Sequence, residues 1–320
     1  DEAHELFKLP EFVNKMMENK WLGSKTGQGF YKKEGKDILT LDLDTLEYRA
    51  NKKASFATLE LTKTIEKPID RFKVLVTGKD KAGDFYRKNF ASMFQYCSNR
   101  IPEITDAFYK IDDAMKAGFG WENGPFEIWD AIGVEKGIEL MKAEGYQPAS
   151  WVTDMVASGV TSFYSVKDGA THFYSITNKK VEKVPGQDAF IILNNIRESK
   201  KIWNNSDAII TDLGDGIINL EFTSKMNSIG AGVLQGINKA IDIAEKDYNG
   251  LVIGNQGANF SVGANLGMIF MMAVEQEYDE LNMAIKMFQD TMMRCRYSAI
   301  PVIAAPHGMT LGGGCELTMH

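Results

Sequence analysis

Three consecutive glycines, residues 312–314, are the feature that most constrains how this 320-residue chain can fold. A short apolar run at residues 301–305 precedes them and predicts a buried strand, while Cys315, Glu316 and Leu317 follow in a helical register. Because glycine has no side chain, a ligand oxygen can approach the backbone N–H groups here, and the positive end of the next helix favours negative charge. The pattern therefore predicts a strand, a loop and a helix that bind an oxyanion.

The acidic residue Glu316 adds chemistry to this predicted loop. It follows Gly313 by three residues, about one turn into the helix, on the face that carries the glycine N–H groups. A carboxylate and oxyanion donors would then face one pocket. The alternative interpretation is that the glycines only permit close packing of strand and helix, and that Glu316 is a solvated first-turn acid that suits the helix dipole.

A second stretch repeats the arrangement and favours the functional interpretation. Residues 251–254 form another short apolar run, and a polar loop at 255–266 leads into a helical segment at 267–275. Near its end the loop contains Gly263-Ala264, which can offer a second backbone N–H. The two units together predict a pair of amide donors from separate loops.

These two segments resemble the crotonase (enoyl-CoA hydratase/isomerase) family, whose signatures look like G…F..GADL and P.IAA..G.ALGGG.EL. Residues 216–230 are similar to the family's opening G.I.LNRP…NAL, so the resemblance covers roughly residues 206–320. It implies one catalytic residue, two oxyanion amides and four residues that border the substrate. These are Glu316 as general acid or base, Ala264 and Gly313 as oxyanion donors, and Gly263, Asn265, Leu266 and Gly312 as substrate-binding residues. Asn265 stands where the family commonly has Asp.

Two earlier segments resemble the C-terminal domain of 3-hydroxyacyl-CoA dehydrogenases. Residues 21–31 read WLGSKTGQGFY, which looks like the family's LG.KTG.GFY turn, and residues 124–133 read GPFEIWDAIG, which is similar to its GPFE..D.IG motif. In that family the turn closes a first helical copy, so the resemblance implies that a second, scaffolding copy follows. No G-x-G-x-x-G follows a strand, so we expect no nicotinamide site in this chain.

The expected fold class is multidomain. An all-α region similar to the dehydrogenase C-terminal domain precedes a truncated α/β crotonase-like domain of the ββα-spiral type. We predict four segments: 1–33, the end of a first helical domain; 34–159, a second helical domain; 160–204, a hairpin and linker; and 205–320, an incomplete crotonase-like domain. Local patterns predict helices over 56–159, hairpins at 161–176 and 208–222, and a polar connector at 37–53.

The resemblance implies a role in fatty-acid beta-oxidation. The expected reaction is hydration of 2-enoyl-CoA, with the thioester enolate stabilised by the two amides, in a parent protein that also oxidises 3-hydroxyacyl-CoA with NAD. The expected partner is an acyl-CoA substrate, with no cofactor and no metal in this stretch. Hydratases of the family add a second Glu, which would lie beyond His320, so we expect this stretch by itself to be a poor hydratase. The chain begins without Met inside an amphipathic segment and stops at His320 inside a helix, so we expect both ends to be cut from a longer protein. The alternatives are an acyl-CoA isomerase or hydrolase of the same fold, and a non-enzymatic scaffold.

Composition narrows the partners. The formal net charge of −7 argues against nucleic acid, because phosphate binding needs a basic face. No apolar run reaches membrane-spanning length and nothing at Asp1 reads as a signal peptide. Cys97, Cys295 and Cys315 have neither metal nor disulfide spacing, so we expect a cytoplasmic protein, with homo-oligomerisation left open.

Methionine is frequent in two predicted helices of the last segment. Core filling is the favoured interpretation, and lining of an acyl-chain pocket is the alternative. The residues are Met268, Met271, Met272, Met283, Met287, Met292 and Met293.

Overall fold

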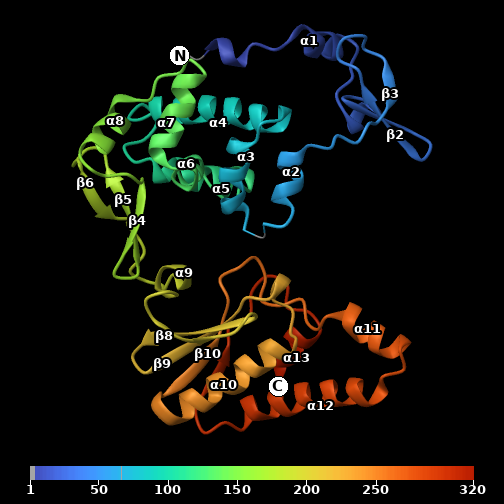
Figure 1. Ribbon diagram of the computed structural model, residues 1–320, viewed down its shortest axis with the longest axis vertical. Helices are drawn as coiled ribbons and strands as arrows, with labels where there is room; N and C mark the ends of the chain where they lie inside the picture. The colour runs from blue at the N-terminus through green and yellow to red at the C-terminus, as the bar shows by residue number, and fades with distance from the viewer. Residues whose placement is uncertain (1–3, 66) are drawn as a thin grey trace. The chain divides into compact units, whose positions relative to one another are not determined.

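The computed structural model describes residues 4–65 and 67–320 of the chain, which form two compact units. The first unit comprises residues 1–164 and 174–181, and the second comprises residues 165–173 and 182–320. Figure 1 shows both units, with labels on their helices and strands. The predicted segment 1–33 begins on residues 1–3, which lie outside the described residues, and the predicted four-part division stays a prediction.

The first unit begins with short helices and a small antiparallel sheet, where the sequence predicted a connector. The helices are η1 (His4–Phe7), α1 (Glu11–Glu18) and η2 (Ser24–Thr26), and the strands are β1 (Tyr31–Glu34), β2 (Asp37–Leu41) and β3 (Tyr48–Ala50), in the order β1-β2-β3. The connector prediction for 37–53 was therefore wrong. Two observations account for the sheet. The Leu41 side chain is buried, with 3% exposure, and the Tyr48 hydroxyl donates to the carbonyl oxygen of Gly29 at 2.6 Å.

Helices predominate between residues 57 and 157 of the first unit, where the sequence predicted them. They are α2 (Ala57–Thr62), α3 (Pro68–Thr77), α4 (Lys81–Asn99), α5 (Tyr109–Phe119), α6 (Pro125–Ile132), α7 (Val134–Ala143) and α8 (Ser150–Ala157). Aromatic rings fill their core: Phe94 and Trp129 are fully buried and stack with centroids 4.6 Å apart. Proline in the first turn of α6 and glycine at its end delimit that helix.

A buried carboxylate ties α5 to α6. Asp112 accepts hydrogen bonds from the backbone N–H of Phe126 at 2.9 Å and of Glu127 at 3.1 Å, and from the Tyr164 hydroxyl at 2.7 Å. Burial raises the pKa of Asp112 to about 7, although the hydrogen bonds act in the opposite direction. The charge state of this side chain therefore changes near neutral pH.

The predicted hairpin at 161–176 is confirmed. Strands β4 (Tyr164–Lys167) and β5 (Ala170–Ser175) flank a turn in which Asp168 and Gly169 both have positive φ, and β6 (Lys180–Lys183) completes a sheet in the order β4-β5-β6. The ambiguous stretch 190–205 contains one helical turn, α9 (Leu193–Ile196), and strand β7 (Lys201–Asn204).

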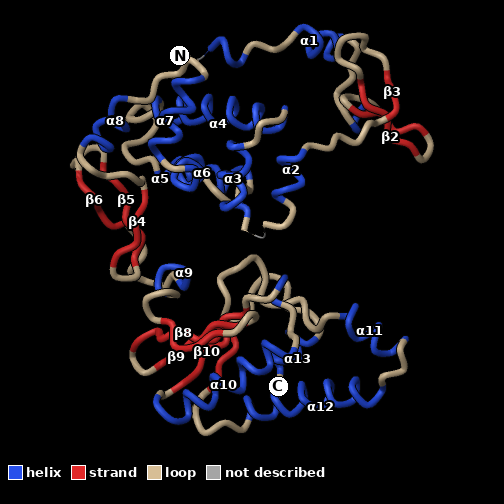
Figure 2. Tube along the Cα trace, in the orientation of Figure 1, coloured by secondary structure: helices blue, strands red, loops and turns tan. Residues whose placement is uncertain are grey.

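The second unit is built on a five-stranded sheet in the order β11-β10-β9-β8-β7. After β7, its strands are β8 (Ala208–Gly214), β9 (Ile217–Phe222), β10 (Gly250–Ile253) and β11 (Val302–Ala304); its helices are η3 (Lys225–Asn227), α10 (Ala231–Asp247), α11 (Leu266–Val274), α12 (Tyr278–Arg296) and α13 (Gly313–Met319). The hairpin β8-β9 is antiparallel, whereas β9, β10 and β11 pair in parallel. Helix α10 packs on the sheet and α12 packs on α10 (Figure 2).

One apolar stripe of α10 supplies much of this unit's core. Its residues lie three or four positions apart and are buried against the sheet: Val233, Leu234, Ile237, Ala240, Ile241 and Ala244. Each large side chain buried there stabilises the fold by about 1.5–3 kcal/mol. The predicted hairpin at 208–222 and the strands of β10 and β11 are confirmed, but the expected burial of β11 was wrong. Ile303 is 59% exposed because Val302 and Ala304 pack against the core, and the side chain between them projects from the opposite face of the strand.

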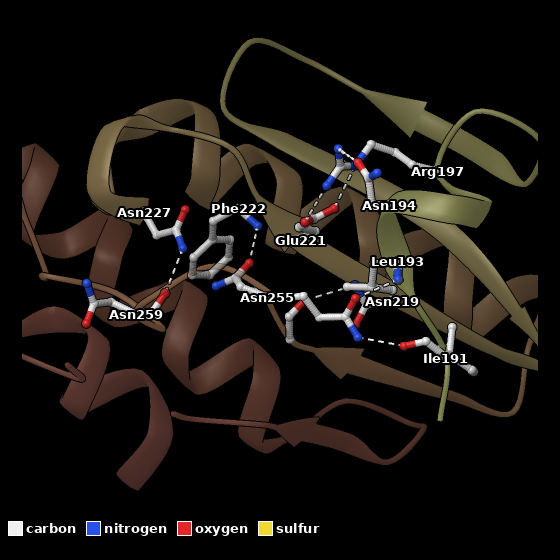
Figure 3. A network of polar contacts seen from close by, with 12 residues as sticks. Ile191, Leu193, Asn194, Arg197, Asn219, Glu221, Phe222, Asn227, Asn255 and Asn259 are labelled. Atoms are coloured by element: carbon white, nitrogen blue, oxygen red, sulfur yellow. Dashed lines mark hydrogen bonds and ion pairs between the residues drawn. The ribbon is translucent and has the colours of Figure 1, made fainter. Parts of the chain in front are cut away.

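Polar side chains hold the loop after β10 in place (Figure 3). Asn255 accepts from the Phe222 N–H at 2.6 Å and donates to the Phe260 carbonyl at 2.8 Å. On β9, the buried Glu221 forms a bidentate ion pair with Arg197, at 2.8 and 3.0 Å. These bonds satisfy buried polar groups and fix where the loop leaves the sheet.

Candidate functional site

Two strand–loop–helix units lie side by side at one edge of the parallel sheet, one from β10 to α11 and the other from β11 to α13. The loops that follow the strands are themselves paired. The backbone N–H of Ser261 donates to the Met309 carbonyl at 3.1 Å, and the Leu311 N–H donates to the Ser261 carbonyl at 2.9 Å. The parallel pairing of β10 and β11 thus continues into the loops and brings both predicted oxyanion segments together.

Glycine is required at the crossing of these loops. Gly263 has φ +86°, and a Cβ placed there would lie 2.7 Å from the Leu311 carbonyl oxygen and 2.9 Å from the Gly313 amide nitrogen. A Cβ on Gly314 would lie 2.8 Å from the Ser261 Cβ. Any side chain at either position would force the loops apart.

The amide groups of Ala264 and Gly313 come close together. A Cβ built on Gly313 would lie only 3.7 Å from the Ala264 amide nitrogen. Within residues 4–65 and 67–320, neither amide has a hydrogen-bond acceptor in the protein. Both residues line the same cavity.

That cavity has a volume of about 840 Å³ and is lined by residues of α10, α11, α12 and α13 and of the glycine loops. Its apolar lining includes four of the methionines predicted as core filler: Met268, Met272, Met287 and Met293. The core-filler prediction was wrong for these side chains, of which Met268, Met287 and Met293 are 41–48% exposed. It was right for Met292, which is 4% exposed and belongs to the core, although it also borders the cavity.

Glu316 lies on the first turn of α13 and lines the cavity with Ala264 and Gly313. Its side chain is exposed rather than buried, and in the described part of the chain its carboxylate has no hydrogen-bond or ion-pair partner. It is the one acidic residue in the described lining. Glu316 therefore borders the cavity and is also exposed to solvent, whereas Gly313 is buried.

The other predicted substrate-binding residues are divided. Asn265 lines the cavity and also caps α11, because its side-chain oxygen accepts from the Met268 N–H at 3.2 Å. Gly263 and Gly312 are not among the lining residues; they adjoin Ala264 and Gly313 in sequence and have positive φ angles of +86° and +47°. Leu266 is 76% exposed and does not line the cavity. The roles proposed for these residues stay predictions.

A family comparison covers this region. Residues 213–320 match the family model described as enoyl-CoA hydratase/isomerase. This chain carries an enoyl-CoA hydratase/isomerase domain. The resemblance read from the glycine motifs is confirmed, and because the matched family consists of enzymes, the domain is an enzyme domain.

Two relatives each align with both the hydratase/isomerase domain and the helical region that precedes it. Over 98% of its length the chain is 43% identical to a probable 3-hydroxyacyl-CoA dehydrogenase of Bacillus subtilis. Over its whole length it is 26% identical to a putative fatty acid oxidation complex trifunctional enzyme of Rickettsia felis. The chain spans 39% and 40% of the lengths of these two relatives. The resemblance to dehydrogenase proteins is thus confirmed in sequence, while the dehydrogenase-type fold of the helical region stays a prediction.

Among solved structures, the crystal structure of an enoyl-CoA hydratase from Bacillus anthracis matches 35% of this chain and 44% of that chain, at 23% identity and a TM-score of 0.32.

Several residues of the hydratase/isomerase domain that shape the site were not singled out in the sequence. Phe288 on α12 lines the cavity, and its ring atoms would lie 3.2 Å from a Cβ on Gly313. His320 also lines the cavity. Phe288 belongs to the apolar stripe of α12, but its position beside a glycine loop depends on how α12 packs. Nothing in the pattern around His320 marks it.

Residues 4–65 and 67–320 contain no group of three or more His, Cys, Asp or Glu side chains arranged to hold a metal ion. No helix in the described part of the chain is long and apolar enough to cross a membrane.

Proposed function

We propose that the hydratase/isomerase domain hydrates 2-enoyl-CoA thioesters. The observation that carries this proposal is the shared cavity: two amides without acceptors and one carboxylate, contributed by Ala264, Gly313 and Glu316, line a single apolar hollow. An unsaturated thioester needs donors for its carbonyl oxygen, a group that moves a proton, and an apolar surface for its acyl chain. The lining offers all three.

The amides of Ala264 and Gly313 act on the thioester oxygen. When water adds across the 2,3 double bond, electrons move toward that oxygen and an enolate forms. Backbone donors already aimed at the oxygen stabilise this charge without reorganising, an effect of about 3 kcal/mol for each donor. The close approach of the two loops at Gly263 supports a geometry in which both donors reach one oxygen.

Glu316 moves the protons. Its carboxylate takes a proton from water as the water oxygen bonds to C3 of the substrate, and the resulting carboxylic acid returns a proton to C2 as the enolate collapses. The sum of these steps is the addition of one water molecule, and Glu316 ends in its starting state. Because the carboxylate is exposed, substrate must exclude solvent from it during turnover.

We propose in addition that the full-length protein takes part in fatty-acid oxidation and oxidises 3-hydroxyacyl-CoA with NAD, as the name of the Bacillus subtilis relative suggests. We place no NAD site in this chain. The glycine loops that follow its parallel strands, at residues 263 and 312–314, lie at the proposed acyl-CoA cavity, and no G-x-G-x-x-G loop follows a strand in the described residues. No step of the proposed hydration depends on NAD.

Isomerisation of 3-enoyl-CoA to 2-enoyl-CoA is the second candidate function. The presence of a single acidic residue in the described lining favours it, because one carboxylate suffices to move a proton between C2 and C4 of an acyl-CoA. The same two amides would stabilise the dienolate oxygen. Hydration and isomerisation differ in whether water becomes part of the product.

The test compares crotonyl-CoA hydration by the full-length protein and its Glu316→Gln variant, alongside isomerisation of a 3-enoyl-CoA. We expect kcat for hydration to fall about a hundredfold or more, because general acid–base catalysis is lost while the shape of the site is kept. Glu280→Gln is the matched control, since Glu280 is an exposed glutamate of α12 outside the cavity lining. Equal rates for wild type and Glu316→Gln would remove Glu316 from the mechanism. A wild type that isomerises without hydrating would establish the second candidate.

A further inference from the structure

The fully buried Ser261 lies where the two glycine loops meet, and its hydroxyl makes two hydrogen bonds. The hydroxyl donates to the Asn227 carbonyl oxygen at 2.7 Å and accepts from the Gly263 N–H at 3.0 Å. The Ser261 backbone also pairs with Met309 and Leu311 of the second loop. All its polar groups are therefore engaged in joining three segments of the chain.

The segment that follows β9, residues 227–229, is linked by hydrogen bonds to both the N–H and the carbonyl oxygen of Gly263. Asn227 reaches the Gly263 N–H through the Ser261 hydroxyl, while the Ile229 N–H donates directly to the Gly263 carbonyl oxygen at 2.9 Å. The Gly263 carbonyl and the Ala264 N–H belong to one planar peptide and point in opposite directions. Fixing the peptides on both sides of Gly263 therefore fixes the direction of the Ala264 N–H.

Asn227, which accepts the hydrogen bond from the Ser261 hydroxyl, is itself fixed by its backbone conformation and its side chain. Met226 and Asn227 both have positive φ, +55° and +54°, an unusual conformation for two successive residues with side chains. The Asn227 side chain donates to the Asn259 carbonyl at 2.9 Å, as Figure 3 shows, and the Asn259 side chain accepts from the Met309 N–H at 2.9 Å. Asn259 is thus hydrogen-bonded to the same two residues, Asn227 and Met309, as Ser261 itself.

We propose that Ser261 is a positioning residue for the oxyanion site: its hydroxyl aims the Ala264 N–H at the substrate carbonyl without touching substrate. This inference rests on the proposed acyl-CoA function. It also assigns a reason for serine at a position where packing alone would accept alanine. Replacing the hydroxyl leaves the Gly263 N–H and the Asn227 carbonyl without this partner and frees rotation about Gly263.

The experiment uses the full-length protein and its Ser261→Ala and Ser261→Cys variants, with Ser98→Ala as the control. Ser98 is a fully buried serine of the first unit whose hydroxyl donates to the Gln95 carbonyl, so its replacement removes a serine hydrogen bond from the unit that does not contain the glycine loops. Two quantities are measured: kcat and KM for crotonyl-CoA hydration, and the infrared carbonyl stretch of bound butyryl-CoA labelled with ¹³C at the thioester carbon. Butyryl-CoA has no double bond, so it reports carbonyl polarisation without turnover.

For Ser261→Ala we expect kcat to fall about tenfold to a hundredfold with little change in KM, because the oxyanion donor is misaligned mainly in the transition state. The carbonyl stretch, lowered on binding to wild type, should return toward its value in solution. Ser261→Cys, whose thiol is a weaker donor and acceptor, should fall between wild type and Ser261→Ala in both quantities. Ser98→Ala should match wild type in both.

The outcomes separate the two proposals. A wild type that neither hydrates crotonyl-CoA nor shifts the carbonyl stretch refutes the proposed function. An active wild type, together with a Ser261→Ala variant that matches it in both kcat and the carbonyl stretch, refutes the role of Ser261 alone. If Ser261→Ala does not fold, Ser261→Cys decides the matter, and its equality with wild type in both quantities overturns the inference.

Discussion

Replacing Gly263 by alanine tests the geometry on which the proposed site depends. The new Cβ would lie 2.7 Å from the Leu311 carbonyl oxygen and 2.9 Å from the Gly313 amide nitrogen, and Gly263 also has φ +86°. Relieving these contacts requires the loops to separate by about 0.5 Å. The left-handed conformation costs a further 1–2 kcal/mol or so with a Cβ present. Because Gly313 is one proposed oxyanion donor, the substitution should change the spacing of both donors.

The assay must separate strain from displacement, and Gly214 provides the matched control. It lies in the same unit with φ +92°, but a Cβ built there meets nothing within 4 Å. Gly214→Ala should therefore lose about 1–2 kcal/mol of unfolding free energy and keep its hydration rate. Gly263→Ala should lose more stability and, in addition, show kcat for crotonyl-CoA hydration lowered about tenfold to a hundredfold. Loss of enoyl-thioester absorbance measures the rate, and urea unfolding followed by circular dichroism measures the stability.

The rate comparison can contradict the reasoning directly. If folded Gly263→Ala hydrates crotonyl-CoA as fast as Gly214→Ala does, then the approach of the two loops has no bearing on catalysis, and the pairing of Ala264 with Gly313 as oxyanion donors is refuted. A joint fall in both variants would mean that strain anywhere in this unit lowers activity. The donors would then have no special part in the loss.

Two further predictions concern buried charges. Since burial raises the pKa of Asp112 to about 7, the folded protein holds a proton there that the unfolded chain releases near pH 4. Asp112 should therefore lower the free energy of unfolding by up to roughly 4 kcal/mol between pH 4 and pH 7, with no further fall above pH 7. Burial also raises the pKa of Asp130 to about 7, so Asp112→Asn should keep part of the fall; urea titrations at several pH values measure it, and a fall in Asp112→Asn as large as in the wild type would contradict the prediction. Arg197→Met should destabilise the second unit by about 3–5 kcal/mol, because it leaves Glu221 buried and unpaired. Lys286→Met, which breaks an exposed ion pair with Asp290, should cost less than about 1 kcal/mol. Similar losses of stability for the two variants in thermal unfolding would show that burial of Glu221 does not matter.

The amino-acid pattern predicted most elements of the second unit. The alternating residues of β8 and β9 and the three- and four-residue spacing along α10 place apolar side chains on one face, and those faces are buried in the structure. The strand–glycine–helix order likewise indicated where α11 and α13 begin. These features depend on residues near one another in the chain, which is why local patterns suffice.

The errors share a different cause. The sheet β1-β2-β3 was missed because its strands are only three to five residues long and are stabilised by pairing with one another. Burial of Ile303 and of the cavity methionines was misjudged because an apolar residue has the same local pattern whether or not a neighbouring element covers it. Exposure is decided by neighbours that a local pattern does not contain.

By itself the sequence determined the chemical groups of the proposed site: a glycine run, a second Gly-Ala loop and an acid one turn into a helix. Only the tertiary structure decided that the amides of Ala264 and Gly313 share a cavity with Glu316, that Ser261 joins their loops, and that the carboxylate is exposed. The physical reason is distance along the chain. Some fifty residues separate the two loops, and the parallel pairing of β10 with β11 is what brings their backbone groups to within hydrogen-bonding distance of each other.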